Sequence, residues 1–365
     1  GLDGPYTQIL IDSRPIFSAL SGVYGLEQIP ANMIERVEVM RGGGSALFGS
    51  SAIAGTINII TKEPLRNSGQ LAHTITSIGG SSSFDNNTSL NASLVTDDHR
   101  AGLYVFGQNR HRDAYDHDGD GYSEMPKLKN QTVGFRSFLK TSTYSKLTFE
   151  YHHLQEFRRG GNMLNRPPHE ADIAEQIQHS INGGGLKFDY FAPNEKHRLT
   201  LYTSAQHTDR DSYYGSKKDL NAYGKTTDLT FIGGSQYVYS FDKCLFMPAD
   251  LTAGLEYNRD NLKDDMWGYN RYTRQTVNIG SAFFQNEWKN EKWSILLGGR
   301  LDKHNLINHV IFSPRANLRF NPTQDVNLRL SYSSGFRAPQ AFDEDLHIEN
   351  VGGTVAMIER AKDLK

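Results

Sequence analysis

Residues 33 to 62 decide the fold, and they read MIERVEVMRGGGSALFGSSAIAGTINIITK. The apolar residues Ile34, Val37 and Val39 predict a first strand. The glycines at 42–44 permit backbone conformations that are closed to other residues, so we expect a turn there. A short helical turn over 45–52 and a second strand over 56–60 are expected to follow. The sequence changes character after Pro64, which predicts the end of a compact unit.

Four charged residues lie among the apolar residues of this stretch: Glu35, Arg36, Glu38 and Arg41. One interpretation is a solvated strand edge. The other is a paired cluster that faces a wall of surrounding protein, because a charge taken out of water must be paired. We predict the second arrangement, with these four residues contributing contacts to that wall.

The chain beyond Ser68 contains about thirteen segments of eight to fourteen residues in which apolar and polar residues alternate. This period of two is the signature of half-buried strands. In residues 325–333, for example, Val326, Leu328, Leu330 and Tyr332 alternate with polar residues. The polar positions repeatedly carry full charges. One face of each strand is therefore expected to meet apolar surroundings, and the other to meet water or a polar filling.

The connections between these segments alternate in length. Short connections are predicted at 97–99, 142–144, 193–196, 290–291 and 322–324. Long ones are predicted at 111–127, 158–176, 209–227, 260–274 and everything after Ser334, with 242–249 and 303–308 as exceptions. Up-and-down strands place successive connections at opposite ends, so the long loops share one rim. That layout is typical of bacterial outer-membrane barrels.

Composition and motifs exclude several classes of protein. The chain has 365 residues, with 39 basic and 41 acidic residues, so its net charge of −2 does not indicate a nucleic-acid partner. No apolar run is long enough for a transmembrane helix, but transmembrane strands never show such a run. Cys244 is the single cysteine. The sequence shows no zinc-protease motif, nucleophile elbow or phosphate loop, and we expect no enzyme activity.

One segment has the pattern of a cation site. Carboxylates at alternate positions around glycines suit a hard cation such as Ca²⁺, and the candidates are Asp116, Asp118, Asp120 and Glu124. An EF-hand would require an acid at position 127, where the chain has Lys127. A structural calcium ion is therefore one interpretation, and a solvated acidic turn is the other. No further cofactor is expected.

The predicted long-loop rim is rich in aromatic and basic residues, which suits a bulky, partly apolar and often anionic ligand. The alternative for any single aromatic residue is a place in the girdles that barrels carry at both membrane boundaries. The candidates for ligand contact in these loops are Arg158, Arg159, Tyr213, Tyr214, Trp267 and Tyr269.

The stretch from Ile34 to Thr61 resembles the second half of the plug domain of TonB-dependent outer-membrane receptors. Phe336-Arg337-Ala338-Pro339 resembles a box found in the same family. The resemblance implies an all-β fold: a transmembrane antiparallel β-barrel of 22 strands, with an N-terminal α+β plug in its lumen. Residues 1–64 would be the C-terminal part of the plug, and 65–365 the first part of the barrel. We expect a fragment that lacks about nine strands, the signal peptide and the TonB box.

The resemblance also implies a function. Such receptors carry out energy-coupled uptake across the outer membrane of Gram-negative bacteria, here of a metal chelate: a ferric siderophore first, then cobalamin or haem. His347 follows the box where haem receptors place an iron ligand, although Ala361-Lys362-Asp363-Leu364 departs from the motif that follows there. Implied partners are the TonB-ExbB-ExbD complex, the chelate, a surface lipoprotein and outer-membrane lipid or lipopolysaccharide. Alternatives are a glycan or peptide importer, a passive porin and an adhesion barrel.

Overall fold

The computed structural model describes residues 7–13, 30–41, 49, 52–53, 55–336, 340–341, 346–351 and 354–357. Most of these residues lie in strands, and the helical segments are single 3-10 turns: η4 (Ala31–Met33), η5 (Pro168–Glu170) and η6 (Trp267–Tyr269). Within these ranges, no helix has the length and apolarity needed to cross a membrane.

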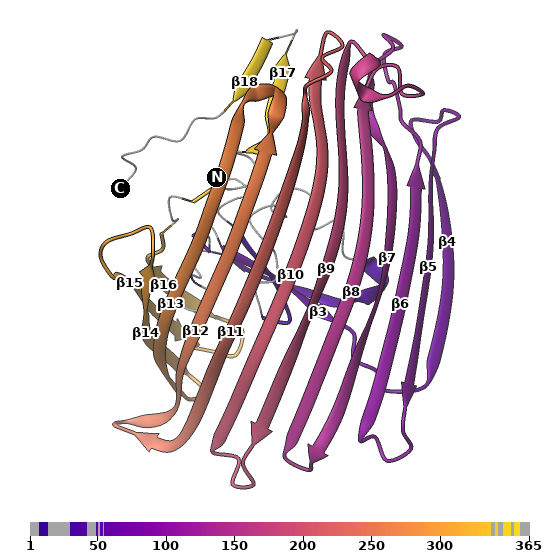
Figure 1. The fold of residues 1–365 in the computed structure, drawn as a ribbon. Helices are drawn as coiled ribbons and strands as arrows, with labels where there is room; N and C mark the ends of the chain where they lie inside the picture. The colour runs from indigo at the N-terminus through magenta and orange to yellow at the C-terminus, as the bar shows by residue number, and fades with distance from the viewer. Residues whose placement is uncertain are drawn as a thin grey trace.

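One large sheet dominates the molecule (Figure 1). In the described residues it has 13 strands, which follow one another in chain order, each antiparallel to its neighbours. The prediction of about thirteen strands starting at Ser68 is confirmed. The strands are β4 (Ser68–Ser77), β5 (Phe84–Val95), β6 (Ala101–Arg112), β7 (Ser123–Ser142), β8 (Ser145–Gly161), β9 (Ile173–Phe191), β10 (His197–Ser216), β11 (Tyr223–Cys244), β12 (Met247–Met266), β13 (Arg271–Lys289), β14 (Trp293–His304), β15 (Ile311–Phe320) and β16 (Leu328–Ser333).

The strands are longer than predicted. β11 has 22 residues, and β7, β10 and β12 have 20 each. At about 3.4 Å per residue, 20 residues reach about 65 Å, whereas 9–11 tilted residues cross a bilayer. The apolar-polar alternation stops near residue 259, but the backbone ladder continues to Met266. The loops are therefore shorter than predicted. The link between β10 and β11 is 217–222, and that between β12 and β13 is 267–270.

The connections fall on two rims as predicted. We call the end with 113–122, 162–172, 217–222, 267–270 and 305–310 the loop rim. The opposite end, with 96–100, 143–144, 192–196, 245–246, 290–292 and 321–327, is the turn rim. The predicted long link at 242–249 is wrong, because β11 and β12 extend until only Leu245 and Phe246 separate them.

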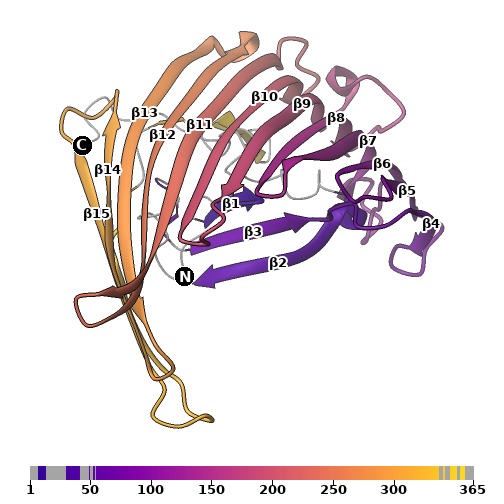
Figure 2. The same ribbon diagram turned by 90° about the horizontal axis from the view of Figure 1, so that it is seen from below.

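The sheet is curved (Figure 2). Its two faces carry different kinds of side chain. On β10, the concave side carries buried polar residues such as Ser204, Gln206 and Arg210. The convex side carries exposed apolar residues, including Leu201 on β10 and Leu255 on β12. This is the expected pattern for strands with an apolar exterior and a polar filling.

A small N-terminal sheet lies on the concave side of the large one (Figure 2). Its order is β1 (Thr7–Ile11), β3 (Gly55–Thr61) and β2 (Ile34–Arg41), with β1 parallel and β2 antiparallel to β3. Ile11 and Ile59 are its buried core. The two predicted strands are confirmed. The predicted glycine turn at 42–44, and most of the helical turn after it, lie outside the described residues.

The chain after β16 returns to the loop rim. β17 (Ile348–Val351) and β18 (Thr354–Met357) form a hairpin. Ile348 is buried with Ile177, Tyr214 and Met266, and Nη2 of Arg271 donates to the carbonyl oxygen of Leu346 at 2.6 Å. These contacts fasten this segment to the inner face of the large sheet. Arg337 to Pro339 of the predicted box, and 361–364, lie outside the described residues.

Candidate functional site

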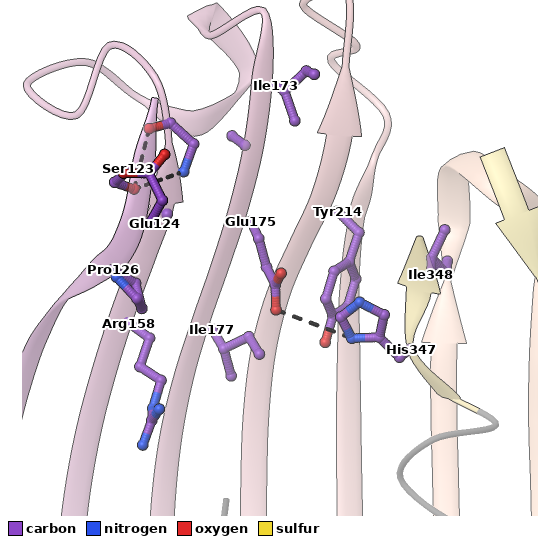
Figure 3. A pocket seen from close by; sticks show the side chains of 13 residues that line it. Ser123, Glu124, Pro126, Arg158, Ile173, Glu175, Ile177, Tyr214, His347 and Ile348 are labelled. Atoms are coloured by element: carbon purple, nitrogen blue, oxygen red, sulfur yellow. Dashed lines mark hydrogen bonds and ion pairs between the residues drawn. The ribbon is translucent and has the colours of Figure 1, made fainter. Parts of the chain in front are cut away.

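A cavity of about 310 Å³ opens on the concave face near the loop rim (Figure 3). Strands β7 to β10 line it on one side, and His347 and Ile348 line it on the other. The sheet places these side chains together because successive residues of a strand alternate between faces. The charged and aromatic members of the lining are Glu124, Arg158, Glu175, Tyr214 and His347.

The polar groups of this pocket are held by identifiable contacts. The His347 ring lies against Tyr214, with ring centroids 4.9 Å apart, and its Nδ1 is 4.0 Å from the Glu175 carboxylate. Nε of Arg158 donates to the buried carboxylate of Glu156 at 2.7 Å. The pocket thus combines aromatic and aliphatic surface with charges of both signs. Such a lining can hold a bulky ligand that is partly apolar and carries polar groups.

The acidic segment predicted from the sequence lies at the edge of this pocket. One carboxylate oxygen from each of Asp116, Asp118, Asp120 and Glu124 falls in a group whose members are all within 4.8 Å of one another, and all four residues are exposed. Asp116 also accepts hydrogen bonds from the backbone N–H groups of Gly119 and Gly121, at 2.7 and 2.8 Å. The oxygen donors suit Ca²⁺. Because the same hydrogen bonds also stabilise a turn without an ion, calcium stays a prediction.

Two pairs of neighbouring candidates are divided between the faces of the sheet. Arg158 and Tyr214 line the pocket, whereas Arg159 and Tyr213 lie on the opposite face and are fully buried. Nη2 of Arg159 donates to the carbonyl of Asn162 at 3.0 Å, and the Tyr213 hydroxyl donates to the carbonyl of Asp219 at 2.8 Å. These two residues brace loops 162–172 and 217–222. The expectation that they contact a ligand is therefore corrected.

The remaining rim candidates lie in η6. Tyr269 donates from its hydroxyl to the backbone carbonyl of Tyr214 and packs against the clusters around Tyr213 and Tyr214. Trp267 is exposed and is not part of the pocket lining. Tyr269 thus supports the pocket from behind, and ligand contact by Trp267 stays a prediction.

A second set of contacts joins the N-terminal sheet to the inner wall. Arg136 of β7 contacts Asp12, which follows β1, and Thr61, which ends β3. Its guanidinium also lies 3.6 Å from Glu63 and 3.6 Å from Glu150. The Arg136 side chain is only 9% exposed. One arginine of the wall therefore holds the ends of two strands, and we call these five residues the Arg136 cluster.

A second arginine of the wall, Arg300 on β14, lies against the N-terminal unit. Arg300 is buried, and its nitrogens donate to Asp302 at 2.8 Å and to Glu256 at 2.7 Å. Gly49 has φ +80°, and a Cβ placed on it would lie 3.2 Å from Nη2 of Arg300. Glycine is needed there both for the backbone conformation and for this close approach.

The four charges predicted to make the wall contacts are placed differently. Glu35, Arg36 and Glu38 are exposed, and Arg36 pairs with Glu38 at 2.8 Å. In the part of the chain that the structure describes, none of these three forms a hydrogen bond or ion pair with the large sheet. β2 is an edge strand of its sheet, and Figure 2 shows it on the open side of the curved sheet. The side chain of Arg41 lies outside the described residues.

The charged contacts with the wall come instead from Asp12 and Glu63, and Thr61 adds a hydrogen bond; sequence reasoning missed all three. The Tyr104 hydroxyl also donates to the carbonyl oxygen of Asn32 at 2.9 Å. Nζ of Lys146 adds a hydrogen bond to Glu63 at 3.0 Å. The available signal was an acid directly after a strand and another directly before Pro64. Both positions lie where the N-terminal unit turns towards the wall.

A curved antiparallel sheet with polar lining, apolar exterior and a small folded unit tied to its inner wall defines a plugged barrel. The chain matches the family model described as TonB dependent receptor-like, beta-barrel over residues 64–365, and the TonB-dependent receptor plug domain over residues 1–56. It belongs to the TonB-dependent receptor family, and the plug match covers β1, β2 and the first two residues of β3.

The individual proteins that resemble this chain share about a quarter of its residues or fewer. The chain is 24% identical over 354 residues to the vitamin B12 transporter BtuB of Vibrio vulnificus, covering 94% of this chain and 54% of the transporter. It is 26% identical over 360 residues to the iron-regulated outer membrane virulence protein of Vibrio cholerae, covering 93% and 51%. The crystal structure of the siderophore receptor PirA from Acinetobacter baumannii superposes with a TM-score of 0.80 at 19% identity, covering 93% and 54%. The chain spans about half the length of these proteins.

Proposed function

We propose that this chain is part of an outer-membrane receptor that imports a metal chelate by TonB-coupled transport. The observation that carries the proposal is that the pocket and the plug lie on the same, concave face of the sheet. The pocket at the loop rim has a mixed apolar and charged lining, and the Arg136 cluster holds the plug to the wall. Long loops face the outside in barrels of this layout, so the pocket would meet ligand from the medium.

The contacts suggest how capture and transport are divided. Ligand would bind at the pocket, and passage would then require the plug to move, because β1 to β3 occupy the concave side. The plug is joined to the wall at Arg136 by charged and hydrogen-bonding groups, which water can replace during movement. An apolar interface of the same size would resist separation. The TonB-ExbB-ExbD complex would supply the energy, as the family implies.

The named functions of the relatives support a chelate as cargo. They include a vitamin B12 transporter, a siderophore receptor and a ferric enterobactin receptor, PfeA of Pseudomonas aeruginosa. A ferric siderophore is our first candidate, and cobalamin or haem comes next. A passive porin is not favoured, because it would leave the concave side open. A surface lipoprotein partner remains a prediction from the family.

Two experiments test this function: ligand binding by the protein purified from its native membrane, and ligand uptake by whole cells. Fluorescence quenching would compare a ferric siderophore, cobalamin and haemin, and radiolabelled uptake would be measured in cells with and without TonB. We expect tight binding of one chelate and uptake that is lost without TonB. Binding of none of the three, or uptake that is independent of TonB, would overturn the proposal.

A further inference from the structure

The positive charge in the lining of the loop-rim pocket is already compensated by the protein. Among the described residues that line it, Arg158 is the one arginine or lysine, and its side chain is only 11% exposed. Its Nε donates to Glu156 at 2.7 Å, and in Figure 3 its guanidinium points away from Glu175. The Glu156 side chain is fully buried and also accepts a hydrogen bond from Asn130 at 2.9 Å. A carboxylate on the turn-rim side of the pocket therefore matches the charge of Arg158.

The two carboxylates in the lining have no such counter-charge. Glu175 on β9 lies 4.0 Å from Nδ1 of His347, and the described part of the chain gives it no other ion pair or side-chain hydrogen bond. Glu124 on β7 accepts a hydrogen bond from the backbone N–H of His117. No arginine or lysine of the described ranges forms an ion pair with either carboxylate. Both can therefore attract a charged group of a ligand.

Charges just outside the lining do not reverse this balance. Arg112 on β6 donates to the carbonyl of Pro126 at 3.2 Å, and Arg271 on β13 lies 3.2 Å from Asp264. The three aspartates of the acidic segment stand at the edge of the pocket, in the same group of carboxylates as Glu124. Acids thus outnumber arginines around the pocket in the part of the chain that is described. Charges of one sign around a concave site focus its potential, so the pocket attracts cations.

The uncharged part of the lining also suits a cation. The Tyr214 ring lies against His347, with centroids 4.9 Å apart, and Glu175 stands beside them (Figure 3). A ligand ammonium group can bind a carboxylate and an aromatic face together, and both attractions grow when water is excluded. Ile177 and Ile348 add apolar surface around this place. The pocket therefore presents a carboxylate next to aromatic and apolar surface.

We propose that this pocket selects chelates that carry a cationic group, such as a primary ammonium, over chelates that carry negative charge. Glu175 binds the ammonium group, Tyr214 and His347 lie against the alkyl chain next to it, and Glu124 adds a second negative charge. An anionic chelate would have to approach both carboxylates, and such like-charge contacts are unfavourable. This inference rests on the proposed function, because it specifies the charge of the chelate that the receptor would import.

Titration with one chelate in three charge states tests this inference. The probes are ferrioxamine B, which ends in a free ammonium group, its neutral N-acetyl derivative, and its N-succinyl derivative, which ends in a carboxylate. Fluorescence quenching of the receptor, purified from its native membrane, is measured without added calcium at about pH 8, where histidine side chains are generally neutral. We expect affinity to fall in that order. The ammonium form should bind about tenfold more tightly than the acetyl form, as for a hydrogen bond between charged groups.

Two substitutions with opposite effects separate the charge of the pocket from general damage. Glu175→Gln should weaken the ammonium form about tenfold and leave the acetyl form nearly unchanged. Glu156→Gln removes the counter-charge of Arg158, so it should strengthen binding of the carboxylate form and weaken that of the ammonium form. The matched control is Glu170→Gln, an exposed acid of loop 162–172 outside the pocket, which should change neither. A heat-modifiability gel checks that each variant keeps its barrel.

Several results would overturn this inference and leave the proposed function standing. The acetyl or succinyl form could bind the wild type as tightly as the ammonium form does. Glu175→Gln could weaken all three forms equally, which would indicate a structural role for Glu175. Binding of haemin, which carries carboxylates, but of none of the three forms would have the same consequence. Failure of all three forms, cobalamin and haemin to bind would instead overturn the proposed function, and this inference with it.

Discussion

At the loop rim, the two faces of β8 and β10 carry the same residue types in different surroundings. On the inner face, Arg158 and Tyr214 line the pocket. On the outer face, Arg159 and Tyr213 are 2% and 0% exposed and bond to the backbone of loops 162–172 and 217–222. The outer pair is therefore part of the scaffold, and the inner pair belongs to the ligand side. Substitutions on the outer face should lower stability, and those on the inner face should change binding or plug movement.

The largest effect is expected at Tyr213. Replacing it with alanine removes a fully buried aromatic ring and its hydrogen bond to Asp219, which should cost about 3–5 kcal/mol of stability. Limited proteolysis should show new cleavage within 217–222, and the temperature of heat modification should fall. If the loop stays protected in Tyr213→Ala, the scaffold role of the outer face is wrong.

The second-largest effect is expected at Arg136 on the inner wall, where a substitution should weaken the docking of the plug. Arg136→Met removes the partner of Asp12 and leaves a largely buried carboxylate without its counter-charge, at a cost of about 3 kcal/mol to plug docking. Hydrogen exchange should become faster in β1 and β3 while β8 to β10 stay protected. Lys146→Gln, whose side chain is more exposed, is the matched control and should change exchange much less. Equal protection of β1 and β3 in Arg136→Met and the wild type would contradict the role of the cluster.

A smaller effect is expected within the pocket. His347→Ala removes the ring that lies against Tyr214 near Glu175, and chelate binding should weaken about tenfold, or by about 1.4 kcal/mol. Stability should be nearly unchanged, because His347 is partly exposed. The control is Arg166→Ala, an exposed rim arginine paired with Glu170 outside the pocket. Titration by fluorescence quenching gives both affinities, and equal values would remove His347 from the site.

The smallest effect is expected in the acidic segment. If the group around Asp118 holds Ca²⁺, its exposed ligands predict weak binding, with a dissociation constant of about 10⁻⁴–10⁻³ M. Asp118→Asn should weaken it about tenfold in a terbium luminescence titration, whereas Asp97→Asn in a turn-rim connection should not. Absence of saturable binding in the wild type would leave a solvated turn as the correct interpretation.

Sequence patterns predicted those features that depend on near neighbours along the chain. The period of two indicated the strands and their number, because alternation is a local property of a half-buried strand. The cluster around Asp116 was also predictable, since its members lie within nine residues. Strand lengths were underestimated, because outward residues such as Arg259, Asn261 and Lys263 are polar although their backbone remains paired.

Only the tertiary structure decided which partners meet across the chain. Arg136 and Asp12 are 124 residues apart, and no local pattern links them. Likewise, the sequence alone does not distinguish Arg158 from Arg159. Their roles differ because the strand register directs Arg158 to the inner face, whereas Arg159 lies on the outer face and is covered by loop 162–172. Alternation is thus written in the sequence itself, whereas strand length, loop length and burial at a given position depend on the pairing and packing of distant segments.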